Sequence, residues 1–404
     1  MKSHFLIRKL HLPNRRTIAT ELGTGNASLV ESFEKMYKQH PFTLKATLRQ
    51  GEIDTDLLSA CSMRGIPSMA PGDNAVYLFA DESALQEWSR RQSFYGETEE
   101  KLVRELRLFL ERHNRTVFEM VSERYVFNFG GPTRLMGILN ITPDSFFDGS
   151  RYAEKSAAVE RGFEMEEQGA DIIDIGGEST RPGAVPVSEA EELARIIPVI
   201  ESLASEIKIP ISVDTYKAPV AEAAIQAGAT IVNDISGLQF DPHLLEVVAH
   251  YAVPIVLMHI KGRPADMQTN PVYENMMDEL FSFFVNSIEK AEEAGIDRSR
   301  IILDPGLGFG KRLWDNYDIL QRLPELKGLG CPLLVGPSRK SFIGKILNLP
   351  VEERLEGTAA CVTAAVANGC QLVRVHDVKE MLRVVQIADV ICGNVVLDEQ
   401  DLGE

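Results

Sequence analysis

Short runs of apolar residues, each followed by polar residues, recur from residue 134 onward. The segments between them have the 3.6-residue period of amphipathic helices. Uninterrupted apolar runs indicate strands that are buried on both faces, as in a parallel sheet covered by helices. The chain has eight such runs, at residues 135–140, 171–176, 210–215, 230–235, 254–259, 300–304, 332–336 and 372–376.

Eight strands that alternate with helices over about 260 residues match the size of a (β/α)₈ barrel, also called a TIM barrel. A doubly wound open sheet is the alternative architecture. It usually has fewer strands and often carries a glycine-rich turn after the first, which residues 139–142 do not provide. The pattern predicts helices at residues 153–168, 188–205, 219–227, 276–294 and 357–368.

The first part of the chain has a less regular pattern and predicts a smaller α+β domain. It combines a possible strand at His4–Ile7, helices at Ala27–Gln39 and Thr98–Arg112, and an apolar run at Ala75–Ala80. No chemical motif stands out in it, and a packing or oligomerisation appendage is the simplest interpretation. We therefore expect an N-terminal domain of unknown role at residues 1–125 and a catalytic barrel at residues 126–404.

Composition narrows the function classes. Hydrophobic residues make up 44% and charged residues 25%, which excludes long disorder and a disulfide scaffold. The net charge of −17 argues against nucleic acid or an anionic membrane surface as a partner. Five cysteines without a CxxC pair favour a reducing compartment, and no apolar run approaches the roughly 18 residues of a membrane span. We expect a cytoplasmic protein.

Every predicted barrel strand ends in polar residues. Barrel enzymes place their chemistry at these carboxyl ends, so the side chains are expected to form one ring around one mouth. Groups suited to the edge of a flat nitrogen heterocycle are Asp214, Asn233, Asp304 and Lys340. Groups suited to a polyanion such as a diphosphate are Asn140, Arg181, Arg374 and His376.

Three loops near this ring have unusual composition. Residues 142–151 and 178–186 are rich in Gly, Pro, Ser and Thr, and we interpret both as lids over the mouth. Residues 306–311 (GLGFGK) have the wrong glycine spacing for a dinucleotide or phosphate loop. Their glycines are expected to let the backbone approach a planar ligand.

The same segments carry a resemblance to a known family. MGILNITPDSFFDG (136–149) and DIIDIGGESTRPGA (171–184) are similar to the two signature segments of dihydropteroate synthases. The motifs SVDTYK, IVNDISG, LMH, LDPGLGFGK, GPSRKSF and RVHD follow in the family's order. The resemblance covers residues 134–395 and omits the first domain.

The resemblance implies a (β/α)₈ barrel and a transferase reaction in folate biosynthesis. The family joins 6-hydroxymethyl-7,8-dihydropterin diphosphate to p-aminobenzoate, with Mg²⁺ as cofactor, and releases 7,8-dihydropteroate and pyrophosphate. It also implies a homodimer. Two alternatives stay open: a pterin-binding methyltransferase on the same barrel, and a non-catalytic pterin-binding protein.

Carried over residue by residue, the resemblance assigns three groups of substrate-binding residues. The pterin group is Asp214, Asn233, Ile235, Met258, Asp304, Lys340 and Arg374. The diphosphate group is Asn140, Arg374 and His376, with Asn140 as the metal ligand. The p-aminobenzoate group is Phe146, Thr180, Arg181, Pro182, Phe309, Lys340 and Ser341. The residues expected to be catalytic are Asp214, Asp304, Lys340, Arg374 and His376.

Overall fold

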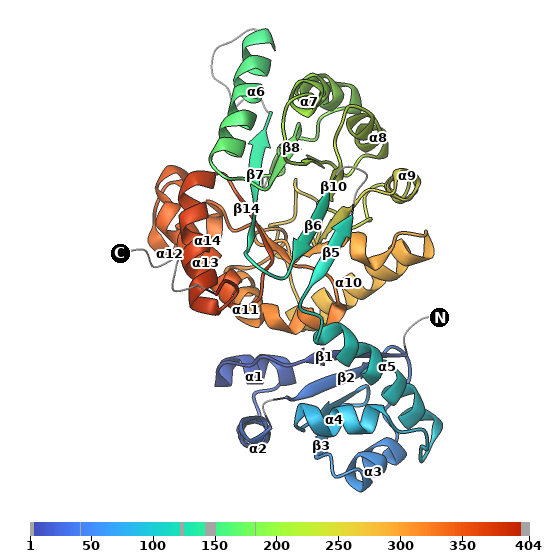
Figure 1. The fold of residues 1–404 in the computed structure, drawn as a ribbon. Helices are drawn as coiled ribbons and strands as arrows, with labels where there is room; N and C mark the ends of the chain where they lie inside the picture. The colour runs from blue at the N-terminus through green and yellow to red at the C-terminus, as the bar shows by residue number, and fades with distance from the viewer. Residues whose placement is uncertain (1–3, 41, 122–124, 142–150, 182, 397–404) are drawn as a thin grey trace. The chain divides into compact units, whose positions relative to one another are not determined.

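The computed structural model describes residues 4–396 except 41, 122–124, 142–150 and 182 (Figure 1). The chain divides into two compact units. Unit 1 contains residues 1–115, 273–282 and 321–330, and unit 2 contains residues 116–272, 283–320 and 331–404. The boundary at residue 125 between the two domains expected from the sequence stays a prediction.

Unit 1 is built on a four-stranded antiparallel sheet with the strand order β1-β2-β4-β3. Its strands are β1 (Phe5–Lys9), β2 (Leu44–Leu48), β3 (Ser68–Met69) and β4 (Ala75–Leu78). Its helices are α1 (Arg15–Leu22), α2 (Ala27–Gln39), α3 (Thr55–Met63), α4 (Glu82–Ser89) and α5 (Glu97–His113). The α+β class predicted for this part of the chain is confirmed.

Alternation along β4 explains how both faces of this sheet are covered. Val76 and Leu78 pack with apolar residues of α3, α4 and α5, whereas Tyr77 and the following Phe79 pack with α1 and α2. Successive side chains of a strand point to opposite faces, so one apolar run supplies two cores. Helices therefore lie on both faces of the sheet.

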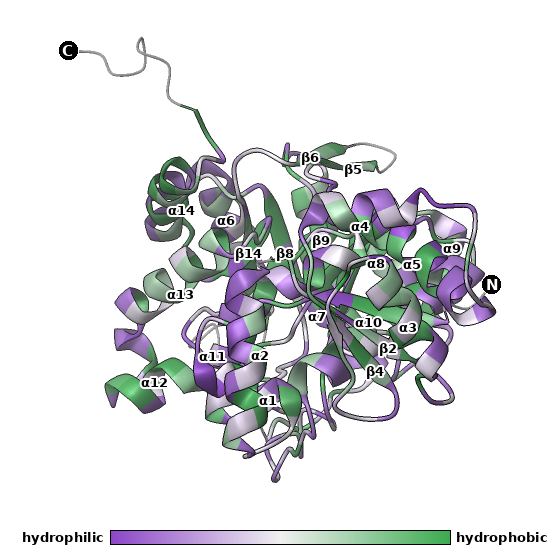
Figure 2. Ribbon diagram, turned by 90° about the horizontal axis from the view of Figure 1, so that it is seen from below, coloured by the Kyte–Doolittle hydropathy of each residue, from purple (hydrophilic) through white to green (hydrophobic). Residues whose placement is uncertain are grey.

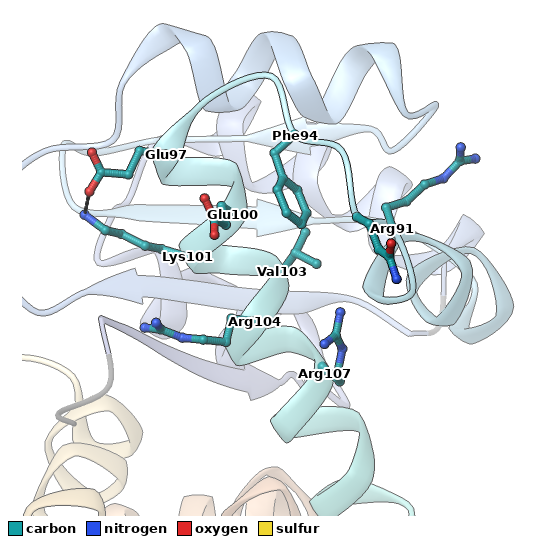
Figure 3. A pocket seen from close by; sticks show the side chains of 9 residues that line it. Arg91, Phe94, Glu97, Glu100, Lys101, Val103, Arg104 and Arg107 are labelled. Atoms are coloured by element: carbon teal, nitrogen blue, oxygen red, sulfur yellow. Dashed lines mark ion pairs between the residues drawn. The ribbon is translucent and has the colours of Figure 1, made fainter.

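A hollow of about 480 Å³ lies beside α5 in unit 1 (Figure 3). Most of its charged side chains have partners close by. Lys101 pairs with Glu97, and the Arg107 guanidinium donates two hydrogen bonds to the Ser89 carbonyl. The lining residues are Arg91, Gln92, Phe94, Glu97, Glu100, Lys101, Val103, Arg104 and Arg107.

Two segments from the second half of the chain complete unit 1. They are the start of α10 (Met276–Glu293) and the end of α11 (Leu313–Arg322) with the 3₁₀ helix η2 (Leu323–Leu329). They supply half of a six-residue ionic cluster, in which three cations meet three carboxylates. The members of this cluster are Arg8, Glu21, Lys45, Asp278, Arg322 and Glu325.

Unit 2 is an eight-stranded parallel barrel with the strand order β12-β11-β10-β9-β8-β7-β14-β13. A parallel bridge between Leu303 and Leu333 joins the two outer strands. The predicted (β/α)₈ barrel is therefore confirmed. Its strands are β7 (Arg134–Asn140), β8 (Ile172–Gly176), β9 (Ile211–Asp214), β10 (Ile231–Asp234), β11 (Ile255–Met258), β12 (Ile301–Asp304), β13 (Leu334–Val335) and β14 (Leu372–Val375).

Helices follow the strands around the barrel. Most are amphipathic; α14 shows hydrophobic and hydrophilic residues side by side in Figure 2. None of the helices in the described part of the chain has both the length and the apolarity that crossing a membrane requires. Besides α10 and α11, the barrel helices are α6 (Arg151–Glu167), α7 (Glu189–Ala204), α8 (Ala218–Gln226), α9 (Leu244–Tyr251), α12 (Ser341–Leu347), α13 (Leu355–Ala367) and α14 (Val378–Cys392); η1 (Arg298–Arg300) and η3 (Val351–Glu353) are short 3₁₀ helices.

A hairpin closes the floor of the barrel. It pairs β5 (Phe118–Val121) with β6 (Val126–Phe129) in antiparallel fashion. Phe118, Met120 and Phe129 are buried in one cluster with residues near the amino ends of seven barrel strands. The floor is therefore apolar and sealed, which leaves the opposite, carboxyl-terminal end for chemistry.

Candidate active site

The centre of the barrel holds a connected polar network. The Arg374 guanidinium, on β14, donates from Nε to Asp174 Oδ2 and from an Nη atom to Asp214 Oδ2, both at 2.6 Å. Asn233 Nδ2 donates to the same Asp174 oxygen at 2.9 Å. Four strands thus bring two carboxylates, one amide and one guanidinium together, because parallel strands point their carboxyl ends in one direction.

Asp174 was not among the residues predicted from the sequence. It lies inside the apolar run of β8 and its residue is 0% exposed, so it reads as part of the strand body. Its Oδ1 is buried and has no hydrogen-bond partner among the described residues. Burying a carboxylate costs free energy unless it is paired. An aspartate within the apolar run of β8 was therefore the sequence signal that could have identified Asp174.

Burial changes the ionisation of the site residues. It raises the pKa of Asp214 to about 7, against the opposing effect of Arg374, and it raises the pKa of Asp304 as well. Burial, aided by the nearby Arg374 charge, lowers the pKa of Lys340 to about 8. Perturbed carboxyl and amine groups gathered at a barrel mouth are typical of a functional site.

The raised pKa of Asp214 makes stability depend on pH. Between about pH 4 and pH 7 the folded protein holds a proton that the unfolded chain has released, so this group's contribution to stability is full below pH 4 and is lost as pH rises through 7. Thermal unfolding of the wild type and of Asp214→Asn from pH 4 to pH 8 measures it. We expect the wild type to lose stability relative to the variant as pH rises; a constant difference would refute the assignment.

One wall of the site is apolar. Ile235, Met258 and Phe309 are buried in a single cluster, with Tyr216 and Phe240 packed against it. The Lys340 ammonium lies 4.1 Å from the centroid of the Phe309 ring, within the range of a cation–π contact. The structure therefore places Ile235 and Met258 of the predicted pterin group beside Phe309 of the predicted p-aminobenzoate group.

The glycines of residues 306–310 allow a close approach between two loops of the barrel, and their predicted approach to a planar ligand stays a prediction. All three have positive φ angles, but a Cβ on Gly306 would lie 2.1 Å from the His259 carbonyl oxygen. A Cβ on Gly310 would lie 2.2 Å from the Lys261 carbonyl oxygen. These two glycines let the backbone of the loop after β12 lie against the backbone of the loop after β11.

Lys311 fastens the same two loops together. Its Nζ lies 2.9 Å from His259 Nδ1 and donates to the His259 and Phe309 carbonyl oxygens at 3.1 and 3.0 Å. Burial lowers the pKa of Lys311 to about 7 and the pKa of His259 well below its usual value. Phe309 is therefore held in place by a buried amine that the sequence analysis did not single out.

Of the residues expected to hold an anion, Asn140 ends β7, and Arg374 and His376 lie at the end of β14. Asn140 is half-buried at the last position of β7. Ser338 Oγ lies 2.9 Å from His376 Nδ1, and burial together with Arg374 lowers the pKa of His376 to about 3. His376 is therefore a neutral imidazole, and Arg374 is the cation of this group.

The p-aminobenzoate residues are described only in part. Phe146 and Pro182 lie outside the described residues. Thr180 is half-buried, whereas Arg181 and Ser341 are exposed. The roles assigned to all the site residues stay predictions.

Comparison with known proteins gives the same picture for unit 2. The family model described as pterin binding enzyme matches residues 136–376, more than half of the chain. The dihydropteroate synthase of Synechocystis sp. is 51% identical over 267 residues, covering 66% of this chain and 92% of that protein. The Bacillus subtilis dihydropteroate synthase is 51% identical over 257 residues, covering 64% and 88%.

A solved structure agrees. The Xanthomonas albilineans dihydropteroate synthase with 4-aminobenzoic acid has a TM-score of 0.64 and 43% identity, covering 68% of this chain and 98% of that one. The relatives account for the barrel with its strand-end residues and leave the first third of the chain uncovered. On these grounds the chain belongs to the dihydropteroate synthase family of pterin binding enzymes.

Proposed function

We propose that this chain condenses 6-hydroxymethyl-7,8-dihydropterin diphosphate with p-aminobenzoate to give 7,8-dihydropteroate and pyrophosphate. The observation that carries the proposal is the network of Asp214, Asn233 and Arg374 beside Asp304 and Lys340 at the carboxyl end of one barrel. Such a set complements a heterocycle with several N–H donors, a carbonyl group and a diphosphate arm.

The pterin is assigned to the centre of the barrel. Asp214 and Asp304 accept hydrogen bonds from its ring nitrogens, and Asn233 and Lys340 contact its remaining polar edge. Ile235 and Met258, which share one apolar cluster with Phe309 of the p-aminobenzoate group, support this assignment. A ligand that displaces water from these buried carboxylates must supply hydrogen-bond donors in its place, because an unpaired buried polar group costs free energy. A pterin has such donors, so the site favours it over a ring that lacks them.

Mg²⁺ is assigned to the diphosphate side of the site. No group of three His, Cys, Asp or Glu side chains is gathered for a metal within the described ranges. The Asn140 carboxamide oxygen suits Mg²⁺, which prefers few protein oxygens together with phosphate oxygens and water. The residues present therefore fit a metal bound mainly by substrate, and the ion would neutralise charge on the leaving diphosphate.

The chain's own residues support a dissociative displacement. The reacting carbon is an exocyclic methylene on an electron-rich ring, so departure of the diphosphate leaves a delocalised cation. Asp214 and Asp304 stabilise positive charge on the ring, while Arg374 and the neutral His376 hold the departing anion. The arylamine of p-aminobenzoate is neutral at pH 7 and attacks without a strong general base.

Incubating the purified protein with both substrates and Mg²⁺, and measuring pyrophosphate release together with dihydropteroate, tests this function. Release of both products in equal amounts is expected. A pterin-binding methyltransferase or a non-catalytic pterin-binding protein would release neither. Omission of p-aminobenzoate is the control for simple hydrolysis of the diphosphate.

We expect p-aminobenzoate to bind poorly to the free protein and at least tenfold more tightly when pyrophosphate and Mg²⁺ are present. The anion would offset the entropy of closing the loops that carry Phe146 and Arg181. Arg181→Ala should remove most of the enhancement and leave pterin binding nearly unchanged. Calorimetric titrations with and without pyrophosphate measure it, and equal affinities would show that the pocket is preformed.

We also propose that the enzyme is a cytoplasmic homodimer. All five cysteines are free thiols, which fits a reducing compartment. On α14, Ile387, Val390 and Ile391 are exposed at helical spacing and offer an apolar face to a second copy. Light scattering of the purified chain tests the dimer.

A further inference from the structure

One buried lysine holds both ends of the loop that follows β8. Glu178 stands two residues after the end of β8, and Val187 directly precedes the N-cap of α7, Ser188. The Lys217 Nζ donates to Glu178 Oε2 at 2.6 Å and to the Val187 carbonyl oxygen at 2.8 Å. A single ammonium group therefore joins the first and last residues of this loop.

The third donor of this ammonium group reaches the neighbouring helix. Lys217 Nζ donates to Glu192 Oε2 on α7 at 2.6 Å, so all of its hydrogens are used. Lys217 and Glu178 are each 9% exposed and Glu192 is 1% exposed. Removal of the Lys217 charge would leave two buried carboxylates uncompensated, which makes the arrangement sensitive to substitution of the lysine.

Glu178 is fixed from its other side as well. The Tyr216 hydroxyl donates to Glu178 Oε1 at 3.0 Å, and the Val187 N–H donates to Oε2 at 3.3 Å. The Tyr216 ring packs at 5.3 Å against Phe240, beside the apolar wall of the site. The start of the loop is therefore connected, through Tyr216, to the apolar wall of the site.

Thr180 and Arg181 stand between these fixed ends. We propose that Lys217 is a positioning residue: through Glu178 and Val187 it fixes the two ends of the loop after β8, and so places Thr180 and Arg181 for p-aminobenzoate. This inference rests on the proposed function. The three hydrogen bonds that the Lys217 ammonium donates go to Glu178, Val187 and Glu192 and not to the central network, so we expect its effect to fall mainly on p-aminobenzoate.

Two variants test the proposal, together with a matched control. Lys217→Met removes the charge that joins the loop ends. Glu178→Gln is milder, because Lys217 keeps Glu192 and the amide oxygen still accepts one hydrogen bond. Lys290→Met makes the first substitution at an exposed lysine of α10. Each is compared with the wild type by steady-state kinetics, by calorimetry with the pterin diphosphate, and by thermal unfolding.

We expect the KM for p-aminobenzoate to rise at least tenfold in Lys217→Met and at least threefold in Glu178→Gln. Affinity for the pterin diphosphate should stay within twofold, and Lys290→Met should match the wild type. Should Lys217→Met fail to fold, Glu178→Gln decides alone.

An equal loss for both substrates, or an unchanged KM for p-aminobenzoate in folded Glu178→Gln, would overturn the positioning role. A wild-type chain that releases no pyrophosphate would instead reject the proposed function and this inference with it.

Discussion

Asp174→Ala is expected to lower the free energy of unfolding by about 3–5 kcal/mol and to reduce pterin binding below detection. Asp174 accepts hydrogen bonds from Arg374 at 2.6 Å and from Asn233 at 2.9 Å and is fully buried. Its removal leaves a guanidinium with one carboxylate fewer and an amide without its acceptor. Chemical denaturation gives the first quantity, and calorimetry with the pterin diphosphate gives the second.

Asp171→Ala is the matched control for this prediction. Asp171 lies three positions earlier and pairs with Arg134 at 2.9 Å, but both side chains are partly exposed. Exposed pairs contribute at most about 1 kcal/mol, so this variant should be far more stable than Asp174→Ala and should bind the pterin normally. Similar losses of stability and of pterin binding in the two variants would contradict the role assigned to the burial of Asp174.

Residues at strand ends were predictable from the sequence because one rule places them. Asp214, Asn233, Asp304 and Arg374 each end or nearly end an apolar run, and parallel strands bring their carboxyl ends to one rim. The eight strands follow from an equally local pattern, the recurring apolar runs. The resemblance to dihydropteroate synthases then indicated which substrate the residues at these positions bind.

Asp174 shows where the local rule stops. Its partner Arg374 lies 200 residues away in the sequence. The two residues meet because β8 and β14 both flank β7. Apolar periodicity gives the number of strands but not which interior side chains face each other across the barrel. Lys217 has the same limitation, since its carboxylate partners come from residues 178 and 192.

The sequence pattern also could not predict which segments of the chain make up unit 1. Arg8 and Glu21 come from the first 22 residues, whereas Arg322 and Glu325 come from the end of α11 and from η2. No spacing signals an ionic contact across 300 residues. Two segments that the sequence analysis assigns to the barrel domain are therefore part of unit 1.

Glu21 is the centre of this ionic cluster, and Glu21→Ala is expected to lower the free energy of unfolding by about 3–5 kcal/mol. Glu21 accepts from Arg8, Lys45 and Arg322, and all four residues are buried. Burial alone would raise the pKa of Glu21, but the three cations hold it below its usual value.

Because the carboxylate stays ionised, the difference between Glu21→Ala and the wild type should persist from pH 8 down to pH 4. Chemical denaturation at several pH values measures it, with Glu34→Ala, whose exposed pair with Lys38 lies on α2, as the control that should match the wild type. Pyrophosphate release by Glu21→Ala at 25 °C shows whether the barrel stays active when unit 1 is destabilised. If Glu21→Ala unfolds at the same denaturant concentration as Glu34→Ala, the cluster does not stabilise the fold.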